Sequence, residues 1–438
     1  MPSARESLFF TGTTFRGGSR TGKNFIKSGP EAHNVLAKAK VLGEAGALQA
    51  SYGNAGLQNS RKIETDRIVI DFWSLLCRHN LLDKSASTQI KWLRKNYPYL
   101  LSEISGTQKV RLALPNIPSN AFARTYWWLP SSIDASLRLD YKPVSYRIAV
   151  GAKATKIWAL HKVPVLDEKW GLPSHIEDSL TSCPFETLSV FAVLQSILGE
   201  IHVRRLSSSL QTSLCFCPTF ALKGFPFPWA SQWSIEKQGP FPTPPSEKVT
   251  TILEPAITNL LDLRDRLLKD PETLLPEIQN IPTNWGMTQL YNHYDNDAFS
   301  APNIQLLRQA HIELLEAVLT AYVSDTSLPQ SGPMFEALRQ DMAQSENNGW
   351  CFDHPWIDRT VRFVPTREFR DRITKILLVA NRERWEQEIS LIANKVQEVL
   401  HKHGYHRSKP NNLLQLALQN GVRIHKDDYE AVMQKLGL

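Results

Sequence analysis

The sequence predicts an α+β protein that is predominantly α-helical, with a small antiparallel sheet in its N-terminal half. Apolar residues recur every three to four positions through most of residues 246–438, as they do on one face of a helix. Residues 107–216 instead contain short β-branched and aromatic runs separated by turn residues, a pattern typical of antiparallel strands. The 438 residues are 42% hydrophobic and 21% charged, which excludes a wholly disordered or collagen-like chain.

Residues 1–30 are predicted to form a flexible basic arm. Gly, Ser and Thr are frequent in it, and such a segment buries too little apolar surface to order itself. It has five basic residues against one acidic residue, which leaves +4 of the formal net charge of +7 in the arm. The basic residues are Arg5, Arg16, Arg20, Lys23 and Lys27.

Residues 31–217 are predicted to form a mixed α/β domain. The alanine-rich stretch 37–48 favours a helix by propensity, and further helices are expected at 68–82 and 90–104. Pro98 ends or kinks the last of these, because proline lacks the N–H that a helix interior needs. The other elements expected here are strands at 109–114, 146–150 and 155–160, a helix at 184–200, and a strand or hairpin at 201–216.

Residues 218–245 are predicted to form an extended strap between two domains. The segment contains seven prolines, a density that forbids a regular helix or a central strand. Its aromatic residues indicate that it lies along an apolar surface: Phe225, Phe227, Trp229 and Trp233. Residues 246–438 then form a helical domain, with helices expected at 246–269, 304–323, 366–404, 411–419 and 426–436.

Cysteine usage and hydropathy argue against secretion and membrane insertion. The five cysteines are irregularly spaced, no signal peptide precedes them, and no window reaches the roughly 18 consecutive apolar residues of a membrane span. We therefore expect reduced thiols and a cytoplasmic or virion location.

Several motifs suggest ligand sites but lack an essential part. Residues 17–24 have the glycine and lysine spacing of a phosphate-binding P-loop, yet Asn24 replaces the metal-binding Ser or Thr. Two thiols, Cys215 and Cys217, have no second pair nearby to complete a zinc site. The histidines of the segment 401–406 lie at the predicted end of a helix, where cations favour the dipole. We therefore predict neither a cofactor nor a metal site.

Two loops combine acidic residues with histidine. The first contains His293, Asp295 and Asp297, and the second contains Asp353, His354 and Asp358. Such loops can hold a divalent ion for phosphodiester hydrolysis, so a metal-dependent nuclease is one hypothesis. Asn and Asp are also ordinary loop residues, which is the simpler interpretation.

The basic arm is the best functional candidate that the sequence offers. Its cations can neutralise phosphates without a fixed geometry, and its interleaved phenylalanines can stack on unpaired bases. A basic arm followed by a helical body rich in Trp and Pro resembles the layout of coat or nucleocapsid subunits of small RNA viruses. That resemblance implies a non-enzymatic, self-assembling structural protein of capsid type that binds RNA or DNA. The alternative is a nucleic-acid-binding subunit of a larger ribonucleoprotein complex in defence or replication.

Overall fold

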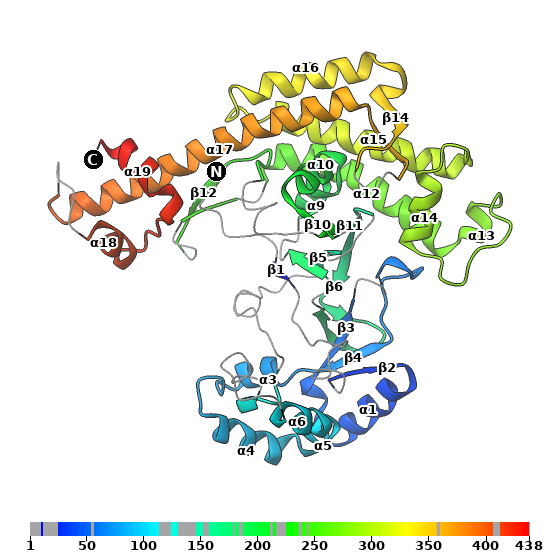
Figure 1. Ribbon diagram of the computed structural model, residues 1–438, viewed down its shortest axis with the longest axis vertical. Coiled ribbons are helices and arrows are strands. Elements are labelled where there is room, and N and C mark those ends of the chain that lie inside the picture. The colour runs from blue at the N-terminus through cyan, green and yellow to red at the C-terminus, as the bar shows by residue number, and fades with distance from the viewer. Residues whose placement is uncertain are drawn as a thin grey trace.

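Three separate hydrophobic clusters form the core of the computed structural model. The largest belongs to a layer of long helices, the second to a smaller α/β unit, and the third to the C-terminal helices (Figure 1). The structure describes residues 10–11, 25–53, 57–113, 124–129, 146–151, 157–177, 180–183, 187–210, 213–215, 225–235, 239–242, 245–356, 360–405 and 412–437.

The smaller unit, here called the sheet unit, is built on a five-stranded sheet in the order β2-β4-β3-β8-β7. Its strands are β2 (Ile26–Ser28), β3 (Leu48–Tyr52), β4 (Arg67–Ile70), β7 (Leu166–Asp167) and β8 (Leu172–Ile176). Strands β3 and β8 are parallel and the other pairs antiparallel, so the sheet is mixed. Its helices are α1 (Gly29–Val41), α3 (Phe72–Arg78), α4 (Ala86–Asn96), α5 (Pro98–Glu103) and α6 (Ser105–Leu112).

The larger unit, here called the helical unit, is a layer of long amphipathic helices at the top of Figure 1. Helices α12 and α15 pack side by side, α16 lies on α15, and α17 lies on α16. The long helices are α12 (Glu247–Lys269), α15 (Pro302–Val323), α16 (Ser331–Gln344) and α17 (Arg367–Lys402). The shorter ones are α9 (Leu188–Gln195), α10 (Ile197–Leu206), α13 (Pro271–Leu274) and α14 (Met287–Tyr294).

An antiparallel four-stranded sheet lies between the two units, in the order β1-β9-β5-β6 (Figure 1). Its strands are β1 (Phe10–Thr11), β5 (Tyr146–Gly151), β6 (Leu160–Pro164) and β9 (Leu180–Cys183). Strand β6 contributes Leu160 to the core of the helical unit and Val163 to the core of the sheet unit. Because one strand serves both cores, the two units are joined by packing as well as by the chain.

Three hairpins complete the strands. They are formed by β10 (Ser208–Leu210) with β11 (Ser213–Cys215), β12 (Ser231–Ser234) with β13 (Gly239–Pro242), and β14 (Trp350–Asp353) with β15 (Arg362–Pro365). Beyond them α17 extends to α18 (Leu413–Gln419) and α19 (Tyr429–Leu436), which pack on its last turns around the third cluster.

The proline-rich segment lies against the helical unit. Phe225, Phe227 and Trp229 are buried in its core, and the phenol of Tyr322 donates to the carbonyl of Pro226 at 2.6 Å. Residues 225–235 and 239–242, the described part of this segment, contain no helix, as expected for a proline-rich sequence. The division of the chain into domains at residues 31–217, 218–245 and 246–438 stays a prediction.

The structure confirms the fold class, α+β with helix predominating, but several predicted elements were wrong. Residues 68–82 were expected to be one helix, yet Ile68–Ile70 form the fully buried strand β4, and the side chain of Asp71 then caps α3. A short apolar run fits a buried strand and a buried helix equally well, so periodicity did not separate them. The strand expected at 109–114 is the end of α6, and residues 201–206 continue helix α10.

Gly286 marks the closest approach between the loop after β3 and the helical unit. A Cβ at this position would lie 2.6 Å from the backbone nitrogen of Ser60 and 2.7 Å from Cα of Asn59. We expect Gly286→Ala to lower the free energy of unfolding by about 1–3 kcal/mol, because backbone atoms must move to admit the methyl group. Urea titration measures this loss.

Gly332→Ala is the matched control, since no atom lies within 4 Å of the added Cβ in the first turn of α16. This control is expected to keep or slightly raise stability, because alanine favours helix over glycine by about 1 kcal/mol. Equal stability of Gly286→Ala and the wild type would show that the two segments do not pack as described.

Candidate functional site

Only one of the predicted arm residues lies within the described structure. Lys27 is in β2, and its ammonium contacts the carboxylates of Glu31 at 2.9 Å and Glu103 at 3.3 Å. Its side chain is 8% exposed, so its charge is neutralised inside the sheet unit and not offered to a nucleic acid. The residues Arg5, Arg16, Arg20 and Lys23, and the P-loop-like segment 17–24, lie outside the described residues.

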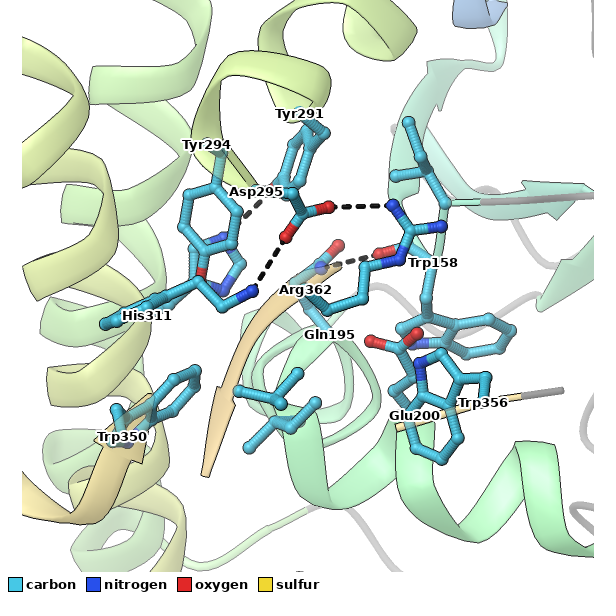
Figure 2. Close-up of a pocket in the computed structure, with 14 residues that line it drawn as sticks. Trp158, Gln195, Glu200, Tyr291, Tyr294, Asp295, His311, Trp350, Trp356 and Arg362 are labelled. Atoms are coloured by element: carbon cyan, nitrogen blue, oxygen red, sulfur yellow. Dashed lines mark hydrogen bonds and ion pairs between the residues drawn. The ribbon is translucent and has the colours of Figure 1, made fainter. Parts of the chain in front are cut away.

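Asp295, predicted as a candidate metal ligand, is instead held by an arginine. It follows the last turn of α14, and its carboxylate accepts hydrogen bonds from Arg362 at 2.8 Å and from the backbone N–H of Phe363 at 3.0 Å (Figure 2). Burial raises the pKa of Asp295 to about 6, although the charge of Arg362 acts in the opposite direction. This pair fastens the β14–β15 hairpin to α14.

Beside this pair lie two neutral titratable groups, His311 and Tyr291, and a carboxylate, Glu200, that pairs with Arg204. Burial lowers the pKa of His311 to about 3 and raises that of Tyr291 to about 12, so the phenol donates to a neutral imidazole across 2.9 Å. Trp350 and Trp356 are among the residues that line the cavity between them (Figure 2). The cavity measures about 40 Å³. Since a water molecule takes up about 30 Å³ in the liquid, there is no room for a substrate.

The second acidic loop does not meet the first at a metal site. Asp353 pairs with Arg370 at 2.6 Å, which lowers the pKa of its carboxyl group, and Asp358 lies outside the described residues. His293 packs beside the rings of Trp285 and Phe299. Within the described ranges, no three His, Cys, Asp or Glu side chains gather closely enough to hold a metal ion.

The other predicted ligand groups are likewise separated. Cys215 lies in β11, while Cys217 and His406 are outside the described residues. His401 and His403 are exposed at the end of α17, and the imidazole of His403 faces the side-chain amide of Asn420 at 3.3 Å.

A basic surface on α4 was missed by the sequence analysis. Residues 72–112 contain seven basic and two acidic residues, a net charge of +5 within a protein of net charge +7. Four of these cations, Lys84, Lys91, Arg94 and Lys95, are exposed on α4 and the turn before it. Among the described residues, none of the four side-chain cations has an ion-pair or hydrogen-bond partner. Figure 1 shows α4 at the outer end of the sheet unit.

The amphipathic character of α4 directs these cations outward. The Ser85 side chain caps the helix by accepting from the N–H of Thr88, and Gln89 and Leu93 are buried on the inner side. Positions three, four and seven apart share a face of a helix, so Ser87, Thr88, Lys91, Arg94 and Lys95 form one surface. Together with Lys84, which precedes the N-cap Ser85, it is here called the α4 face. All six are exposed. The spacing of these cations is visible in the sequence, but their exposure and their lack of carboxylate partners are not.

Comparisons with known proteins give little. No family model and no curated protein matches the chain. A solved structure that matches is the Type IIL restriction-modification enzyme MmeI in complex with DNA, with a TM-score of 0.45 and 15% identity. The match covers 79% of this chain and 36% of that chain, so the present chain spans about a third of the protein it matches. A likeness of this degree assigns no activity.

The expectation of a non-enzymatic, self-assembling coat or nucleocapsid protein was wrong. The structure that the chain matches is an enzyme bound to DNA, not a capsid or virion protein. The expectation also assumed that the excess positive charge is concentrated in residues 1–30. A second concentration of positive charge lies on α4. None of the helices in the described part of the chain combines the length and apolar character that a membrane crossing requires.

The pair between Asp295 and Arg362 predicts a pH-dependent stability. Because folding raises the pKa of Asp295 from 3.8 to about 6, its contribution is fully present below pH 3.8 and is lost as the pH rises through about 6. The loss is about 3 kcal/mol. We expect the unfolding free energy of the wild type, relative to Asp295→Asn, to fall between pH 4 and 6 and then to level off. Urea titrations at several pH values measure it. A relative gain over that pH range would mean that Arg362, not burial, dominates.

Proposed function

We propose that this protein binds duplex DNA through the α4 face. The observation that carries the proposal is a set of four exposed cations at helical spacing with no carboxylate partner in the described structure. Elsewhere on the surface, comparable cations are compensated within their own helix, as in the pairs Arg382–Glu386 and Lys395–Glu398. Single exposed cations such as Lys248 and Lys435 also have no ion-pair partner among the described residues, so what distinguishes the α4 face is the number of cations gathered on one short helix.

The uncompensated charge is unfavourable for the isolated helix. Like charges four residues apart, such as Lys91 and Lys95, destabilise a helix by about 0.2–0.5 kcal/mol. A polyanion removes this repulsion and releases counterions when its phosphates are neutralised. The hydroxyl groups of Ser87 and Thr88 on the same face add hydrogen-bond donors for phosphate oxygens.

The shape of the surface favours DNA over RNA. Helix α4 has 11 residues, which at 1.5 Å per residue gives a rod of about 16 Å. The major groove of B-form DNA, about 12 Å wide, admits an α-helix, whereas the deep and narrow major groove of A-form RNA does not. DNA is the ligand named for the restriction-modification enzyme that the chain matches, and the proposal for this chain rests on α4 alone.

Replacing Lys91, Arg94 and Lys95 together with alanine is expected to weaken duplex binding about tenfold or more. The slope of log affinity against log salt is negative, and each lost phosphate contact reduces its magnitude by about 0.9. The loss of three contacts therefore makes the slope shallower by nearly 3. Fluorescence anisotropy of a labelled duplex, measured over a series of KCl concentrations, gives both quantities.

Lys248→Ala/Lys375→Ala/Lys435→Ala is the matched control. It removes the same charge from exposed positions on α12, α17 and α19, and is expected to leave affinity and slope nearly unchanged. Equal losses in the two triple variants would reduce the effect to net charge and contradict a site on α4.

The arm residues Arg5, Arg16, Arg20 and Lys23 stay a predicted second contact to the same DNA. Replacing all four with alanine is expected to lower the salt slope further while leaving the unfolding free energy unchanged. Lys27→Ala is expected to do the reverse, because it leaves Glu31 and Glu103 without their cation inside the sheet unit. Anisotropy and urea titration of both variants test the distinction, and an unaltered slope in the quadruple variant would exclude the arm.

A further inference from the structure

A cavity of about 290 Å³ lies between the sheet unit and α12, apart from the α4 face. The sheet unit contributes Tyr52 and the loop residues 60–64, β6 contributes His161, and α12 contributes Arg264 and Lys269. Its volume equals about ten water molecules at roughly 30 Å³ each. It is therefore large enough for a small organic ligand, unlike the cavity beside Asp295.

Two buried side chains of this cavity, Arg264 and His161, have N–H groups that face no acceptor. Arg264 is 1% exposed; its Nη2 donates to the carbonyl of Leu160 at 3.0 Å, and its guanidinium lies close enough to the Tyr291 phenol to oppose the rise in the pKa of that group. Among the described residues, its Nε and Nη1 atoms and Nδ1 of His161 are buried and have no hydrogen-bond partner. A buried guanidinium without a carboxylate is unfavourable, because burial removes its hydration.

His161 also has a hydrogen-bond donor that faces no acceptor. Burial, with a smaller effect from the charge of Arg264, lowers its pKa to about 3, so the ring is neutral. The amide nitrogen of Gln58 lies 3.3 Å from Nε2 of the imidazole; with the amide in this orientation, the ring accepts at Nε2 and has its proton on Nδ1. Every unpartnered polar atom of Arg264 and His161 is thus a donor, and a fitting ligand is rich in acceptors.

The acidic residues of the lining do not neutralise Arg264. Asp167 accepts from the Tyr52 phenol and from the N–H of Trp170, and Glu64 lies 3.7 Å from Lys62. Glu168 and Asp265 are exposed, as are Lys169 and Lys269. The buried part of the cavity therefore contains Arg264 and Asp167, which are not paired with each other, and the exposed part has charges of both signs.

We propose that this cavity binds a phosphate-bearing ligand, with the phosphate on Arg264 and His161 and with Lys269 closing over it. The guanidinium of Arg264 and the imidazole N–H of His161 together favour an oxyanion that accepts several hydrogen bonds. The apolar wall residues Leu57, Leu268 and Met287 leave space for a non-phosphate group such as a nucleoside. The phosphate comes either from a free nucleotide or from a DNA backbone, and this inference does not depend on the α4 face.

Thermal unfolding of the full chain with inorganic phosphate or adenosine monophosphate tests the proposal. We expect both to raise the melting temperature of the wild type. Arg264→Met is expected to abolish the shift while folding normally, since an apolar side chain replaces an unpaired buried charge. Lys269→Ala is expected to weaken binding about tenfold, as loss of one charged hydrogen bond does. Arg266→Ala, exposed on the same helix but outside the cavity lining, is the control and is expected to keep the full shift.

Duplex binding of the same variants identifies the source of the phosphate. If the two probes give no shift but Arg264→Met and Lys269→Ala weaken duplex binding and Arg266→Ala does not, the cavity takes a backbone phosphate, which supports the proposal. Shifts of equal size in all variants, or no effect in either assay, overturn it. The triple variant of α4 is expected to weaken duplex binding but to keep the rise in melting temperature caused by adenosine monophosphate. The two proposed sites are therefore tested separately.

Discussion

Buried guanidinium groups hold the irregular segments of this protein to its regular elements. Arg111 donates to the carbonyls of Trp127 and Leu129, Arg308 to those of Tyr294 and Asn296, and Arg384 to that of Phe227. Each of these arginines is at most 3% exposed. Loops that run across a core contain carbonyl groups that water cannot reach, and five fixed N–H donors on one side chain satisfy several of them at once. The proline-rich segment and the turn after α14 are placed in this way.

This constraint separates structural arginines from a candidate binding residue. Arg362 and Arg370 have carboxylate partners in Asp295 and Asp353, and Arg384 has one in Asp325. Arg111 and Arg308 have no carboxylate either, but each donates to at least two carbonyls, whereas Arg264 donates to one and borders a cavity. Asp295 and Asp353, from the two acidic loops that suggested catalysis, are thus partners of structural arginines, while Arg264 lies on α12, in a helix whose sequence gave no sign of a site.

The long helices were predictable because local information decides them. Ser246 caps α12, and its apolar residues repeat at helical spacing, so its observed bounds differ by one residue from those expected. Strand β4 was not predictable in this way, since its residues become a strand only by pairing with β2 and β3 on either side. The same holds for charge. Lys27 looked like a free cation of the arm, but it meets Glu103, which is distant in sequence, and Asp295 meets Arg362 across 67 residues. Pairing over such separations requires the fold itself.

The loop of residues 57–66 joins the cavity at Arg264 to the helical unit. Ser60 packs against Gly286 of the helical unit, Arg61 forms a two-point ion pair with Glu272, and both line the cavity at Arg264. The exposed ion pair contributes little on its own. The tight backbone contact at Gly286 therefore does more to hold this loop, and with it one wall of the cavity, against the helical unit. The wall of the proposed phosphate site thus depends on packing between the two units and not on the ion pair.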